Sequence, residues 1–217
     1  MLDLTKYQIW DLTIPYDKWM NGYDYDVAKT IARDGWNART LHLYSHEGTH
    51  MDAPIHFGVG EATIDLFQPS ELMGPAWLVE IPIHQPNQLL TVDDLGEIAA
   101  QFRAADSLLI RTDWSQFLGL DKYRNELPRI SQPLAEWCVA KEVKMLGVEP
   151  PSVADVNNLD EVTIIHHILL KGNVIIIEGL INLGSIQKNK VFLIAMPLKI
   201  KGGDGAPARV VAFEEKS

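Results

Sequence analysis

Short apolar runs with the twofold period of β-strands alternate along this chain with longer segments of helical period. Strands rich in Val, Ile and Leu are expected at residues 40–44, 76–82, 107–111, 144–148, 173–178, 191–196 and 208–213. Helices are expected from Thr91, whose pairing with Asp94 is typical of a helix start, to about residue 103, and at residues 132–141 and 161–170. Because strands and helices interleave, we expect an α/β fold with a central mixed β-sheet and flanking helices, formed by residues 1–217 as a single domain.

Composition argues against several classes of protein. No apolar run reaches the roughly 18–20 residues that span a bilayer, and the N-terminus lacks the basic and apolar regions of a signal peptide. The net charge is −10 without a basic stripe, so nucleic acid is an unfavourable partner. The one cysteine, Cys138, excludes an intrachain disulfide and a cysteine-based metal site. We therefore expect a cytoplasmic protein that binds neither nucleic acid nor membranes.

Three of the seven histidines fall within a segment of eleven residues, together with an aspartate. They are His46, His50, His56 and Asp52. Neutral imidazole and carboxylate are ligands that Zn²⁺, Mn²⁺ and Fe²⁺ accept, whereas a lone histidine on an apolar face is usually a core residue. Fully extended, His46 and His50 would lie about 13 Å apart, but two ligands of one ion need donor atoms within about 3–4 Å. The chain must therefore fold back or make a helical turn, which Gly48 permits and Pro54 ends.

The same residues match a second pattern. His46-Glu47-Gly48-Thr49-His50 has the H-E-x-x-H spacing of zinc proteases, in which Glu acts as general base on a long helix. A strand-like segment precedes this stretch, Gly48 lies at its centre and Pro54 follows it. A stable helix is therefore unfavourable here, so the protease is the minor alternative and Glu47 is expected to be incidental.

The second half of the chain offers two further candidates. A mostly apolar helix carries His166 and His167, which point about 100° apart and cannot both face one site equally. Glu178 ends a buried strand, and ligands of α/β sheets gather at the carboxyl ends of strands. A metal would compensate this carboxylate; a salt bridge or a contact with a helix N-terminus is the alternative.

These motifs identify a family resemblance that extends over almost the whole chain. The pattern H-x-G-T-H-x-D-x-P-x-H is unbroken from His46 to His56, and the chain in this respect resembles the cyclase family that includes bacterial kynurenine formamidase (arylformamidase) and isatin hydrolase. Weaker blocks follow in the family's order, among them Glu178-Gly-Leu and Gly205-Ala-Pro. The resemblance implies a swivelling β/β/α fold, a homodimer or homotetramer, and one or two divalent ions, with Zn or Mn expected.

The resemblance also implies roles for individual residues. His46, His50 and Asp52 would hold the first ion, and Asp52 would bridge to a second ion held by His166 and Glu178. His166 is preferred over His167 because it takes the family's place ahead of a Leu pair. His56 matches the residue thought to handle protons.

The chain departs from the family in the loop after the first strand, which is usually rich in Pro and Gly. Here that loop carries Trp19, Tyr23 and Tyr25, which could stack against an aryl substrate or serve in packing. Glu149 and Ala154 replace positions where the family often has Asp. These departures leave the substrate open.

A site of nitrogen and oxygen ligands without thiolate suits a catalytic ion. The expected reaction is hydrolysis of an amide, formamide or cyclic amide, such as the conversion of N-formylkynurenine to kynurenine and formate in tryptophan catabolism. A zinc protease and a metal-stabilised binding protein without activity are the alternatives.

Overall fold

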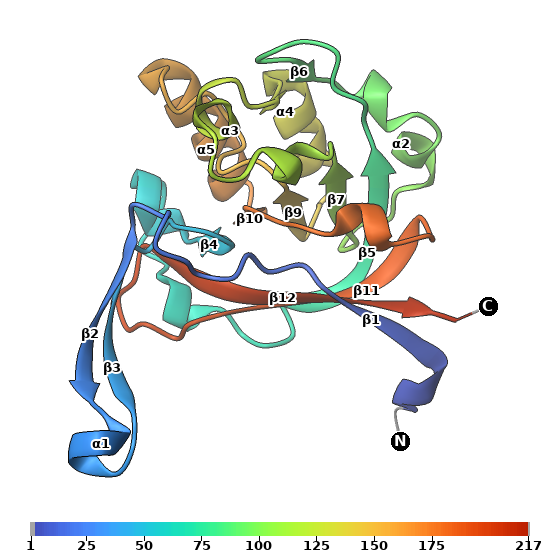
Figure 1. Ribbon diagram of the computed structural model, residues 1–217. Coiled ribbons are helices and arrows are strands. Elements are labelled where there is room, and N and C mark those ends of the chain that lie inside the picture. Colours follow the sequence, from blue (N-terminus) through green and yellow to red (C-terminus); the bar gives the residue numbers. More distant parts are fainter. Residues whose placement is uncertain (1–2, 217) are drawn as a thin grey trace.

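A large mixed β-sheet organises the described part of the chain, residues 3–216 of the computed structural model (Figure 1). Its strands are β1 (Tyr7–Asp11), β4 (His50–Asp52), β5 (Met73–Glu80), β7 (Ser107–Arg111), β9 (Met145–Val148), β10 (Ile175–Glu178), β11 (Lys190–Pro197) and β12 (Gly205–Glu215). Their order is β1-β12-β11-β5-β7-β9-β10-β4, and β4 pairs in addition with β12. The expected mixed sheet is therefore confirmed, and seven of its strands close into a barrel, with β1 added outside β12.

The barrel has a parallel half and an antiparallel half. Strands β5, β7, β9 and β10 are parallel neighbours, whereas β11, β12 and β4 complete the ring by antiparallel pairing. Parallel neighbours need crossover connections, and these carry the helices. The helices are α2 (Ile98–Gln101), α3 (Asp121–Asn125), α4 (Gln132–Ala140) and α5 (Leu159–Lys171). Figure 1 shows α4 and α5 together over β9 and β10.

The parallel strands are buried on both faces. In β7, Leu108 packs with the residues under the helices, and its neighbour Leu109 packs with the residues inside the barrel. Ile176 and Ile177 of β10 divide in the same way. Because successive side chains point to opposite faces of a strand, a strand covered on both sides reads as a continuous apolar run.

Some elements lie outside the barrel. Strands β2 (Tyr23–Lys29) and β3 (Ala38–Leu43) form a hairpin that projects from the body, and α1 (Ile31–Asp34) lies in the connection at its tip (Figure 1). The short strands β6 (Leu89–Leu90) and β8 (Arg129–Ile130) pair with each other.

The single helix expected from Thr91 to residue 103 is wrong. The capping residue is Val92 and not Thr91, and it makes no side-chain cap hydrogen bond. The N–H and hydroxyl of Thr91 instead donate to Asp94 Oδ2 at 2.7 Å and 2.9 Å, and only a 3₁₀ turn (Asp93–Leu95) follows. Gly96 then adopts φ 53°, ψ −134°, outside the helical region, and α2 forms separately after it. Among residues 3–216, no helix combines the length and the apolar character needed to cross a bilayer.

Candidate metal centre

Strand β4 positions the central residues of the motif. Its pairing with β10 places His50 opposite Glu178, and its pairing with β12 places Asp52 opposite Gly205. His50 and Asp52 lie two residues apart and therefore share one face of the strand, while Met51 between them points into the barrel core. The backbone ladder thus brings two carboxylates and an imidazole together from segments far apart in sequence.

The segment before β4 folds back instead of forming a helix. Gly48 has φ 65°, and a Cβ there would lie 2.8 Å from Met20 Cε. The end of β10 approaches equally closely, because a Cβ on Gly179 would lie 2.3 Å from the Gly48 carbonyl oxygen. Thr49 joins the two segments by donating from Oγ1 to the Gly179 carbonyl at 2.5 Å. Glycines at both positions allow His46, which precedes the turn, to return to the site.

The two remaining histidines come from helical segments. His166 lies on the buried side of α5, whereas His167 is exposed and its Nε2 lies 3.1 Å from the Phe57 carbonyl. His56 lies in the 3₁₀ helix η2 (Pro54–Phe57), with its ring stacked on His46 at 3.7 Å between centroids.

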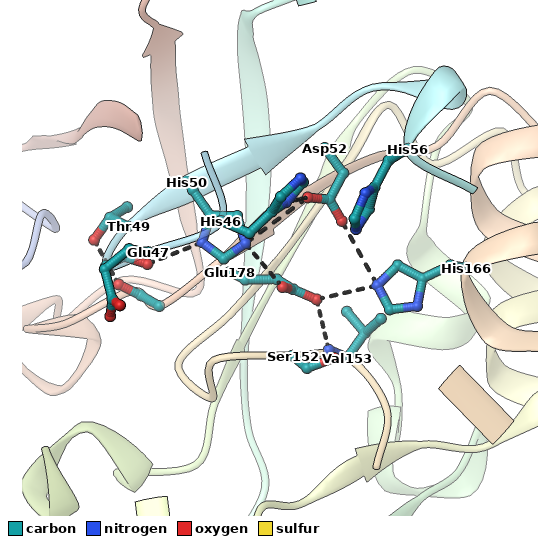
Figure 2. Close-up of polar contacts among 12 residues, drawn as sticks. His46, Glu47, Thr49, His50, Asp52, His56, Ser152, Val153, His166 and Glu178 are labelled. Atoms are coloured by element: carbon teal, nitrogen blue, oxygen red, sulfur yellow. Dashed lines mark hydrogen bonds and ion pairs between the residues drawn. The ribbon is translucent and has the colours of Figure 1, made fainter. Parts of the chain in front are cut away.

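The polar atoms of these residues converge (Figure 2). His50 Nε2 lies 3.1 Å from Glu178 Oε2 and 3.8 Å from Asp52 Oδ1. His166 Nε2 lies 3.6 Å from Asp52 Oδ2 and 3.5 Å from Glu178 Oε1. His46 Nδ1 lies 2.9 Å from Asp52 Oδ1. The structure therefore brings together all five residues that the sequence proposed as metal ligands.

Hydrogen bonds fix the orientation of two of the imidazoles. His50 Nδ1 lies 3.0 Å from the Gly48 carbonyl, and His166 Nδ1 lies 2.7 Å from the Val162 carbonyl. A carbonyl oxygen can only accept, so Nδ1 carries the proton in both rings. In the neutral imidazole the Nε2 lone pair then faces the two carboxylates, as in histidines that bind metal.

The donor set fits a divalent cation. Asp52 Oδ2 is buried and has no hydrogen-bond partner within the described residues. Ligand atoms of two triads, His50–Asp52–Glu178 and His46–Asp52–His56, lie within 4.8 Å of one another in each case. Lone pairs and buried carboxylates that face each other repel unless a proton or a cation lies between them. A metal ion would satisfy all these atoms.

The site strongly favours positive charge. Burial lowers the pKa of His50, but the hydrogen bond and the charge of Glu178 outweigh burial and raise that pKa to about 9. Burial raises the pKa of Glu178, but the hydrogen bonds from His166 and His50 hold it well below its usual range. His56 differs, because burial lowers its pKa.

Glu47 does not take part in this cluster. Its Oε2 accepts a hydrogen bond from the Gly22 N–H at 2.7 Å, and its carbonyl accepts one from the Tyr16 hydroxyl at 2.7 Å. Residues 45–49 form a turn and bend that lead into β4. The helix on which H-E-x-x-H proteases depend is therefore missing from this segment.

A cavity of about 730 Å³ opens beside His46 and His50. Trp19 and Tyr44 are among its lining residues. Tyr23 and Tyr25 are not; they pack against each other along β2, with ring centroids 6.2 Å apart. Trp19 is thus placed beside the site, and substrate contact by the two tyrosines stays a prediction.

Two other polar residues near the site were missed or left open by the sequence reasoning. Asp204, between β11 and β12, lies with its Oδ2 3.0 Å from His46 Nε2; it directly precedes the Gly205 block but carries no spacing signal of its own. Glu149 turns away from the cluster and accepts hydrogen bonds from the backbone N–H groups of Thr112 and Trp114. Glu149 therefore fixes a loop.

The fold and the site together define a class of protein, a closed mixed barrel that carries a buried centre of histidines and carboxylates. The sequence profile of the putative cyclase family matches residues 10–155. A kynurenine formamidase of Salinibacter ruber is 32% identical over 176 residues, which cover 81% of this chain and 79% of that relative. A kynurenine formamidase of Bacillus cytotoxicus is 29% identical over 194 residues, covering 87% and 86%. The chain belongs to the putative cyclase family.

Solved structures agree with this assignment. Isatin hydrolase A from Ralstonia solanacearum superposes with a TM-score of 0.86 at 24% identity, covering 97% of this chain and 93% of that one, which shows the shared fold. A protein described as a potential metal-dependent hydrolase with cyclase activity gives a TM-score of 0.78 at 27% identity, covering 97% and 100%.

Proposed function

We propose that this protein is a metal-dependent hydrolase that cleaves the carbon–nitrogen bond of an aryl amide, formamide or cyclic amide. The observation that carries the proposal is the buried cluster of histidines and carboxylates beside an open cavity. Within it, Asp52 Oδ2 has no hydrogen-bond partner among residues 3–216. Relatives of this protein in the family include kynurenine formamidases. A structural zinc site would be closed and usually contain Cys, whereas the one cysteine, Cys138, lies buried in the core under the helices.

The proposed ligands follow from the cluster. His46, His50 and Asp52 would hold one divalent ion, Zn or Mn, and Asp52 would bridge to a second ion held by His166 and Glu178. His50 Nε2 and Glu178 Oε2 are 3.1 Å apart, a separation that two ligands of one ion can have. If the site holds one ion instead of two, the same side-chain atoms would bind it.

A divalent ion in such a site lowers the pKa of water and polarises a carbonyl. The half-buried His56 would take the proton as water adds to the carbonyl carbon. The carbon–nitrogen bond then breaks, and His56 returns the proton to the leaving nitrogen. A formamide thereby gives formate and an amine.

We expect the metal-loaded protein to hydrolyse N-formylkynurenine to kynurenine and formate, or isatin to its ring-opened acid. Trp19 and Tyr44 at the cavity supply aromatic surface for an aryl group. The measurement is hydrolysis of both compounds with Zn²⁺ or Mn²⁺, using the chelated protein as control. Turnover of neither compound by fully loaded protein would refute an aryl-amide substrate.

Chelation also separates the enzyme from a metal-stabilised binding protein. Structural metal binding is folding energy, so its removal unfolds a protein that depends on it. This chain has large apolar clusters on both faces of the parallel strands. The chelated protein should therefore remain folded, which circular dichroism measures, and reloading it with metal should restore turnover.

We expect Glu47→Gln to keep turnover within about tenfold, or roughly 1.4 kcal/mol of barrier. Glutamine retains an oxygen that can accept the Gly22 N–H, so the loop contact survives. The measurement is kcat on the substrate found above, together with a peptide-cleavage assay. A loss of about 10²–10⁴-fold, the range for a general base, would favour the protease.

The quaternary structure and location are further proposals. A homodimer or homotetramer agrees with the sequence resemblance, and a cytoplasmic location is proposed from the composition. The projecting hairpin exposes apolar side chains such as Val27, Ile31 and Leu41. Such exposed apolar surface often marks a contact between subunits.

A further inference from the structure

The His46 ring bridges two carboxylates through opposite nitrogens. Its Nδ1 lies 2.9 Å from Asp52 Oδ1, and its Nε2 lies 3.0 Å from Asp204 Oδ2. Asp52 belongs to the proposed centre and is buried, whereas the Asp204 side chain is 49% exposed at the rim. Only one of the two ring nitrogens can therefore face the ion.

The contacts of its two ring nitrogens distinguish His46 from His50 and His166. His50 and His166 donate from Nδ1 to backbone carbonyls and direct Nε2 to the site. His46 has no such carbonyl contact among the described residues; its outward nitrogen is Nε2, and the acceptor there is a carboxylate. With the proton on Nε2, the Nδ1 lone pair of His46 faces Asp52 and the ion.

The turn that carries Asp204 is shaped to receive this ring. A Cβ on Gly205 would lie 2.6 Å from His46 Cε1 and 2.7 Å from the Met51 carbonyl oxygen. The Asp204 carbonyl accepts the Ala53 N–H at 2.9 Å, so the turn is fastened to the chain after β4 by its backbone. The backbone is thus held independently of the Asp204 carboxylate. Its Oδ2 lies nearest to His46 Nε2, at 3.0 Å, and farther from Ser45 Oγ and His56 Nδ1, at 3.5 Å and 3.8 Å.

We propose that Asp204 is a positioning residue that holds His46 with Nε2 protonated and Nδ1 directed to the metal, against the bare Cα of Gly205. The inference rests on the proposed metal centre. A carboxylate behind a metal-bound histidine fixes its tautomer and raises its basicity, and the loss of such a partner typically costs about 10–100-fold in metal affinity.

The test measures metal affinity, so it does not depend on which substrate the enzyme takes. Zn²⁺ is titrated into the full chain in competition with a chromophoric chelator, for the wild type, Asp204→Ala and Asp204→Asn. Alanine removes both the acceptor and the charge, so we expect about 10–100-fold weaker binding. Asparagine keeps an acceptor oxygen without the charge, so its loss should be smaller.

Asp65→Ala is the matched control. Asp65 Oδ1 accepts the Gly202 N–H at 2.9 Å and so supports the same loop without touching His46. We expect its Zn²⁺ affinity to match the wild type. An equal loss in this variant would attribute the effect to the loop and overturn the proposal, as would wild-type affinity in Asp204→Ala.

A second measurement reads the ring nitrogen directly. In protein labelled with ¹⁵N-histidine and loaded with ¹¹³Cd²⁺, we expect cadmium coupling to Nδ1 of His46 and to Nε2 of His50. Coupling to Nε2 of His46, or no metal binding by the wild type, would overturn the proposal. Metal binding with the expected coupling but without amide hydrolysis would instead refute the proposed reaction and leave Asp204 in this role.

Discussion

Replacing His50 by alanine is expected to remove most of the bound metal and nearly all hydrolytic activity. His50 lies 3.1 Å from Glu178 and 3.8 Å from Asp52, between two buried carboxylates. The variant loses one metal ligand and leaves the two carboxylates with less positive charge beside them. Removing one partner of a buried ion pair lowers the free energy of unfolding by about 3–5 kcal/mol. The measurements are elemental analysis, turnover and circular dichroism on one preparation. Full metal content in a folded variant would contradict the ligand assignment.

The neighbouring histidines of α5 supply a matched comparison for the same centre. His166 is buried and faces Asp52 and Glu178, whereas His167 contacts the Phe57 carbonyl outside the cluster. We expect His166→Ala to lose metal in the same way as His50→Ala and His167→Ala to retain it. The helix, the residue type and the substitution are the same in both variants. A difference in metal content therefore shows which of the two histidines binds the metal.

Replacing His56 by alanine is expected to leave most of the metal in place and to reduce kcat by on the order of 10²-fold or more. His46, His50 and Asp52 already supply three protein ligands, the usual number for a catalytic zinc with one position left for water. His56 reaches the site from η2, on the other side of Pro54, and stacks on His46. It can therefore exchange protons with a reacting group without being required to hold the ion.

Metal content and kcat must be measured on the same His56→Ala sample. The ligand atoms of His46, Asp52 and His56 lie within 4.8 Å of one another, so ligation by His56 is a real alternative. Parallel loss of metal and turnover would make His56 a ligand. Wild-type turnover with full metal would make it structural.

Local sequence accounts for much of the site and for the parallel half of the barrel. The spacing of His46 and His50 required the chain to fold back or to make a helical turn, and the chain folds back at Gly48 with φ 65°. The apolar runs of β7, β9 and β10 form strands because both of their faces are covered. Prediction failed after Thr91, which donates to Asp94 but does not cap the turn, and Gly96 leaves the helical region after one turn.

The sequence by itself determined which residue types could bind a metal and which strands could form, because spacing and period are local properties. Only the tertiary structure decided how they meet. The pairing of β4 with both β10 and β12 closes the barrel and sets His50 opposite Glu178. Asp204 reaches His46 across 158 positions of the chain. Contacts of this kind depend on strand register and on a turn that is hydrogen-bonded to the chain after β4. Neither can be predicted from a local sequence pattern.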